Sequence, residues 1–269
     1  MKIKLNFKIC FLLYISLLLF VSCEEVIDID LNSSQPVLVA EGTIFKDSVA
    51  YLRLTKTSDY FDDKASSVID DAVVTLTDDK GLKEQLDYIG DGIYLGKEMI
   101  GTVGRTYSIS FSILGKNYSA NTMLIAPVEI YNSNIEKGRE WKFGGSGSET
   151  TEYIINISFS DDPDVDNFYM LKYWNNKSEI GDRYFLSRDV FAKDSIVETS
   201  LRTLDLEKGD YQIEVFSIDE ETYKYHSQLN EISGVRMNSA TPYNPVSNFG
   251  REVMGYFTAL SYSEIKGEF

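Results

Sequence analysis

Apolar and polar residues alternate along much of the chain from residue 37 onward. A period of two places the apolar side chains on one face of a β-sheet, and β-branched and aromatic residues occupy many of these positions. The runs are too short for helices. In the first half of the chain, the alternation predicts strands at residues 37–40, 50–54, 72–76, 107–111 and 118–124.

Turns rich in glycine and aspartate separate these strands, and Ala126-Pro127 marks a predicted domain boundary. Short strands at such spacing are typical of a β-sandwich or a barrel. We therefore predict an all-β protein with two β-sandwich-like domains, at residues 37–126 and 127–269. Strands of the second domain are predicted at residues 128–131, 153–159, 169–174, 195–201, 211–216 and 254–262.

One short helix is predicted near the C-terminus, at residues 218–233. Ser217 and Glu220 have the spacing of a capping box, in which the serine side chain accepts from the N3 amide and the glutamate reaches back. Tyr225, Leu229 and Ile232 then recur at helical spacing, and they predict an apolar face against the core.

The first 22 residues have the pattern of a secretory signal peptide. Three lysines precede an apolar run at residues 9–21, which is shorter than the ~20 residues a membrane-spanning helix needs. The following Leu19-Phe20-Val21-Ser22-Cys23 resembles the lipobox of bacterial lipoproteins. We predict cleavage before Cys23 and acylation of that cysteine with a diacylglycerol and a fatty acyl chain such as palmitate. The alternative is an ordinary signal peptide with an incidental cysteine.

Charge and cysteine count narrow the classes of function. The chain has 26 Lys+Arg, 42 Asp+Glu, one His and two Cys, so its net charge is −16, and removal of the three leader lysines takes it to −19. Nucleic acid is therefore excluded as an expected partner. Cleavage also removes Cys10, which leaves Cys23 as the only cysteine and allows no intrachain disulfide.

Residues 23–36 are predicted to form an acidic tether between the membrane and the first domain. Glu24, Glu25, Asp28 and Asp30 follow Cys23 closely. Acidic residues at this place resemble the surface-export signal of Bacteroidota lipoproteins, although a solvated tether explains them equally well.

Several segments together resemble a family of Bacteroidota outer-membrane lipoproteins that is known only as a domain of unknown function. The resemblance implies a lipoprotein often encoded beside a TonB-dependent transporter, with an immunoglobulin-like fold at residues 37–126. It implies no catalytic residue. The segments that carry it are residues 22–31, 36–42, 71–76, 101–107, 161–163, 167–169 and 248–262.

The densest group of oxygen ligands lies at residues 161–167. Asp162, Asp164 and Asp166 alternate as at the start of a calcium-binding loop. However, Asn167 stands where such a loop has glycine, and Asp-Pro between two strands is a common start of a turn. The sequence favours a turn, with calcium as the alternative. His226, the one imidazole, lies on the predicted helix and is expected to be a packed or solvent-edge residue, with a catalytic histidine as the alternative.

The sequence therefore predicts a non-enzymatic, lipid-anchored binding or accessory protein of the outer membrane, associated with a TonB-dependent transporter and needing no cofactor. A surface hydrolase acting on glycans through paired carboxylates is one alternative. An adhesin or structural envelope protein is the other. With 42 acidic residues, spacing alone does not select a catalytic pair.

Overall fold

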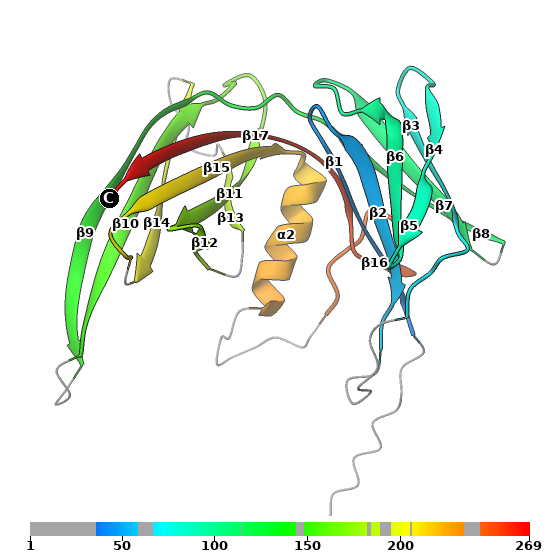
Figure 1. Ribbon diagram of the computed structural model, residues 1–269. Coiled ribbons are helices and arrows are strands. Elements are labelled where there is room, and N and C mark those ends of the chain that lie inside the picture. Colours follow the sequence, from blue (N-terminus) through cyan, green and yellow to red (C-terminus); the bar gives the residue numbers. More distant parts are fainter. Residues whose placement is uncertain are drawn as a thin grey trace, which may run out of the picture. The chain divides into compact units, whose positions relative to one another are not determined.

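A computed structural model describes residues 36–58, 67–113, 115–143, 148–181, 184–188, 195–204, 206–233 and 243–269. The leader, the tether and Cys23 lie outside these ranges. Within them the chain is built mainly of β-strands, with one short helix, α2 (Glu220–Ser233), near the C-terminus (Figure 1). The predicted all-β, sandwich-like fold class is confirmed.

The largest sheet contains ten strands. Its main path runs in the order β12-β11-β15-β17-β1-β2-β6-β5, with β13 beside β11 and β16 beside β1. These strands are β1 (Leu38–Phe45), β2 (Val49–Lys56), β5 (Asp87–Gly90), β6 (Ile93–Ile100), β11 (Phe168–Asn175), β12 (Ser178–Glu179), β13 (Phe185–Arg188), β15 (Asp210–Ile218), β16 (Val253–Met254) and β17 (Phe257–Glu268).

Two smaller sheets complete the described fold. One has the order β4-β3-β7-β8 and the other the order β14-β10-β9. The first comprises β3 (Val73–Asp78), β4 (Lys83–Gln85), β7 (Thr106–Ile113) and β8 (Lys116–Met123), and the second β9 (Ile130–Phe143), β10 (Ser148–Ser160) and β14 (Ile196–Leu204).

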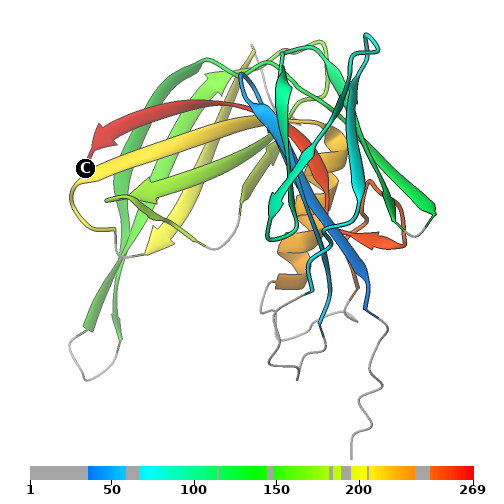
Figure 2. The same ribbon diagram turned by 45° about the vertical axis from the view of Figure 1, so that its right-hand side comes forward.

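The last strand, β17, joins the two parts of the large sheet. Its beginning pairs in parallel with β1, with Phe257 opposite Gly42. The rest pairs antiparallel with β15, from Ser261 opposite Ser217 to the end of the strand. Figure 1 and the turned view in Figure 2 show β17, in red, running from β1 to β15. One backbone ladder therefore continues through the segments that were predicted as separate domains.

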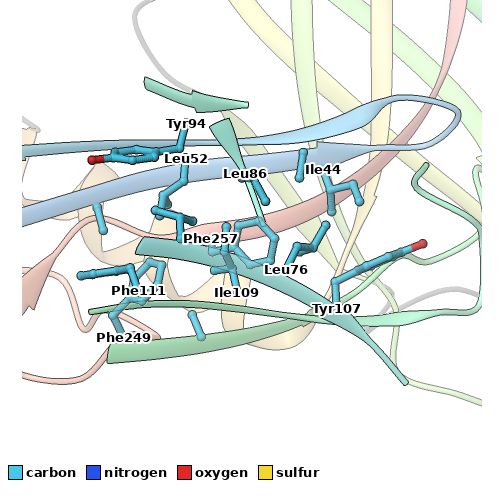
Figure 3. Close-up of a cluster of buried hydrophobic side chains, with 14 of the residues drawn as sticks. Ile44, Leu52, Leu76, Leu86, Tyr94, Tyr107, Ile109, Phe111, Phe249 and Phe257 are labelled. Atoms are coloured by element: carbon cyan, nitrogen blue, oxygen red, sulfur yellow. The ribbon is translucent and has the colours of Figure 1, made fainter. Parts of the chain in front are cut away.

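Apolar side chains form cores on both sides of the irregular segment 124–129. The first core lies between the large sheet and β3, β7 and β8, and it includes Phe249 and Phe257 from the C-terminal part of the chain (Figure 3). The second lies between β10 and β14 on one side and β11 and β15 on the other. Residues 36–269 form one compact unit. The division into two domains at residue 126 stays a prediction.

The helix starts two residues later than the sequence predicts, because a different residue caps it. The Asp219 carboxylate accepts from the Thr222 backbone N–H at 2.8 Å, and the Asp219 carbonyl accepts from Tyr223 N–H at 3.0 Å. Asp219 is therefore the N-cap. The predicted capping box on Ser217 is wrong, because β15 continues to Ile218 and keeps Ser217 in the strand ladder.

The predicted apolar face of the helix is only partly correct. Thr222 is fully buried, and its hydroxyl lies 3.0 Å from that of Thr258 on β17. Tyr225 stacks on Tyr256 with 4.7 Å between ring centroids. Leu229 and Ile232, however, are 37% and 39% exposed. The side chains of α2 are buried where its first turns contact the sheet. Their burial therefore decreases along the helix, although the apolar spacing continues.

Candidate functional site

The loop at residues 161–167 connects β10 to β11 and is a hydrogen-bonded turn. The Asp162 carboxylate accepts from the Asp164 backbone N–H at 3.1 Å. The Asp162 carbonyl accepts from the Asn167 side-chain amide at 2.8 Å. This local bonding is what an Asp-Pro turn between two strands provides.

The structure does not bring the predicted calcium ligands together as a cluster. Asp162, Asp164 and Asp166 are all exposed. In the described part of the chain, no three His, Cys, Asp or Glu side chains are grouped so that they could hold a metal ion. Calcium at this loop stays a prediction from the sequence.

The same loop forms one wall of a cavity of about 560 Å³, which we call the acidic pocket. Its other walls are segment 125–128, the start of β11 and the junction of β15 with α2. Five lining residues are acidic: Asp161, Asp162, Asp166, Asp219 and Glu220. Seven are apolar: Ile125, Ala126, Pro127, Val128, Val165, Phe168 and Ile218. The remainder are Ser160, Asn167, Tyr169 and Ser217.

Serine side chains hold the irregular wall of the acidic pocket in place. Ser261 Oγ on β17 donates to the Ile125 carbonyl at 2.6 Å, and Ser263 Oγ donates to the Val128 carbonyl. On the other side, Ser160 Oγ accepts from the Glu129 backbone N–H at 2.8 Å. A segment with no strand ladder of its own is thereby fixed by bonds to two neighbouring strands.

Two oxygens at this pocket lack a hydrogen-bond partner among the described residues. Tyr169 Oη donates to Asp161 Oδ1 at 2.6 Å, but Asp161 Oδ2 is shielded from solvent and unpaired. Ser217 is 2% exposed, and its Oγ is also unpaired. An unpaired buried acceptor costs about 1–3 kcal/mol, so such groups call for an explanation.

Asp219 differs from Asp161, because both of its carboxylate oxygens are already engaged. Oδ1 caps the helix, and Oδ2 accepts from Thr122 Oγ1 at 2.9 Å. Of the two half-buried carboxylates in the acidic pocket, only Asp161 therefore retains an oxygen for a ligand. The sequence placed Asp161 in the Asp-rich loop and Ser217 at a helix cap, but no local pattern assigns either of them to a binding site.

His226 does not line the acidic pocket. Its ring makes edge contacts with Tyr184 and Tyr225, at centroid distances of 4.8 and 5.4 Å. Burial, and to a smaller extent the nearby Lys172, lowers the pKa of the imidazole to about 4. At neutral pH the ring is therefore uncharged and packed against neighbouring aromatic rings, which is the first of the two environments that the sequence predicts.

This lowered pKa predicts a loss of stability in acid. An unfolded histidine has a pKa of about 6.5, so the unfolded chain takes up the proton first as the pH falls from about 6.5 to 4. Over that window, we expect His226 to remove about 2–3 kcal/mol of unfolding free energy. Urea denaturation at several pH values, with His226→Phe as the control, measures this contribution. Equal pH slopes for both proteins would contradict it.

The fold and the pocket define a class: an all-β, sandwich-like protein with an acidic pocket between segment 125–128, the loop at residues 161–167 and the junction of β15 with α2. The chain belongs to the family described as "Domain of unknown function (DUF4249)", whose model matches residues 24–266. A comparison with curated proteins found no match. Within the described ranges, no helix has the length and apolarity to cross a membrane.

Proposed function

We propose that this protein is a lipid-anchored binding protein of the outer membrane and an accessory to a TonB-dependent transporter. The observation that carries the proposal is the Leu19-Phe20-Val21-Ser22-Cys23 sequence after a short apolar run. The family match covers residues 24–266, so Cys23 and the leader before it precede the matched domain. Two or more acyl chains on Cys23 would give stable attachment, at ~0.8 kcal/mol per buried CH₂.

The acidic pocket supports a binding role over a catalytic one. Hydrolysis by paired carboxylates needs two acids that are both free to act on the substrate. In the pocket, Asp219 is committed to the helix cap and to Thr122, while Asp162 is committed to its own turn. Of the two half-buried carboxylates of the pocket, only Asp161 keeps an unpaired oxygen, which favours holding a ligand over hydrolysing it.

Native purification from outer membranes tests this function. A C-terminally tagged protein, extracted in a mild detergent, is expected to carry a TonB-dependent transporter with it in a stoichiometric amount. Cys23→Ala is the matched control, because the same folded domain should lose both the membrane anchor and the transporter. Recovery of the anchored protein without any transporter would contradict the accessory role.

A further inference from the structure

We infer that the acidic pocket binds a primary alkylammonium group, with Asp161 and Ser217 as the residues that receive it. This inference names the ligand class of the proposed binding site, and in that sense it rests on the proposed function. It follows from three properties of the pocket: its charge, its unpaired oxygens and its apolar wall.

The charge of the pocket selects a cation. Its described lining contains five acidic residues and no lysine, arginine or histidine. Asp161 and Asp219 are half-buried, and carboxylates at a partly buried site attract positive charge more strongly than they would in bulk water. Lys224 pairs with Glu220 at 2.9 Å, which leaves four acids of the lining without a cationic partner among the described residues. An anionic ligand would add to their repulsion.

The two unpaired oxygens select a hydrogen-bond donor. Asp161 Oδ2 and Ser217 Oγ each have an unused lone pair, and Asp161 is held in place by the 2.6 Å bond from Tyr169. Ser217 lies opposite Tyr169 in the β11–β15 ladder, so the serine and the tyrosine that holds Asp161 share one end of the sheet. A serine hydroxyl has three staggered positions about χ1 and can turn to a ligand. An ammonium group has three donors and no acceptor, so it is a group that unpaired acceptor oxygens can receive.

The apolar wall selects an alkyl chain rather than a bare ion. Ile125, Pro127, Val128 and Ile218 face the same cavity as the acids. A divalent metal would need several carboxylates converging on one point, and the described residues offer no such group of three. An alkylammonium buries its methylene stem on apolar surface and presents its charged head to the oxygens.

The test is titration calorimetry on the full mature protein in detergent, with n-pentylammonium as the probe and 1-pentanol as its neutral counterpart. We expect saturable binding of the ammonium and at least about tenfold weaker binding of the alcohol, because a charged hydrogen bond is lost. Nα-Acetyl-lysine methylamide is the third probe. Binding as tight as that of pentylammonium assigns the site to lysine side chains of a protein partner. Much weaker binding assigns it to free alkylamines.

Variants separate a ligand contact from a structural role. Asp161→Asn and Ser217→Ala should each weaken pentylammonium binding about tenfold. Ser217→Ala should leave the urea midpoint unchanged or raised, because it removes an unpaired buried hydroxyl. Asp47→Asn, at an exposed turn residue outside the pocket, is the control and should bind like the wild type.

The inference is overturned if pentylammonium shows no saturable binding, if pentanol binds with equal affinity, or if both pocket variants bind pentylammonium like the wild type. Ordinary water would then be the occupant of the pocket. The transporter purification is independent of this titration. If the transporter co-purifies but the amine does not bind, the ligand class fails alone. If neither is observed, the proposed function fails as well.

Discussion

Replacement of Phe257 by alanine is expected to lower the free energy of unfolding by about 3–5 kcal/mol. Phe257 is the first residue of β17 and is completely buried in the first core. It lies opposite Gly42 on β1 and packs among side chains that come from residues more than a hundred positions earlier (Figure 3). The cavity left by its ring would face a densely packed core that closes only partly.

Urea denaturation of the mature protein, followed by far-UV circular dichroism, measures this loss. Tyr262→Ala is the matched control, because Tyr262 is an aromatic residue on the same strand but is 45% exposed. We expect Tyr262→Ala to lower the free energy of unfolding by less than about 1 kcal/mol, because it removes only surface contacts. If both variants lowered the free energy of unfolding by a similar amount, the first core would not depend on Phe257 of the C-terminal strand.

Replacement of Gly255 by alanine is expected to cost about 3–5 kcal/mol through two effects. Gly255 has a φ of +91°, which residues with a side chain rarely adopt. In addition, a Cβ at this position would overlap the backbone carbonyl oxygen of Ala40 on β1, which belongs to the sheet and cannot easily move.

Gly250→Ala separates the two effects. Gly250 has a φ of +98°, but a Cβ there would meet no atom within 4 Å. This control should therefore show only the backbone strain, about 1–2 kcal/mol. The difference between the two variants, measured from urea midpoints, reports the close approach of the chain to β1. Equal costs would contradict that approach.

The alternation of apolar residues was sufficient to locate most strands, because one face of each is buried. It missed β6, where Gly96, Lys97 and Glu98 interrupt the pattern. The structure shows why a strand forms there nevertheless. A register shift separates the pairs that β6 makes with β2, and the Glu84 carboxylate accepts from three consecutive backbone N–H groups, those of Lys97, Glu98 and Met99. A side chain from another strand replaces the missing ladder partner.

The pairing of β17 with β1 could not be predicted from the sequence, for a different reason. Parallel pairing of the first and last described strands depends on the path of the whole chain, and no local pattern records it. The same limit applies to the acidic pocket. The Asp-rich loop stands out in the sequence, but Asp161, Ser217 and segment 125–128 meet only because β10, β11 and β15 are neighbours in space.

Membrane attachment through Cys23 is the claim on which the proposed function depends most directly. Intact mass spectrometry of the protein purified from outer membranes measures it. We expect a chain that starts at Cys23, lacks residues 1–22 and carries the added mass of a diacylglycerol, with or without a further acyl chain. An unmodified chain, or one cleaved at another position, would contradict it.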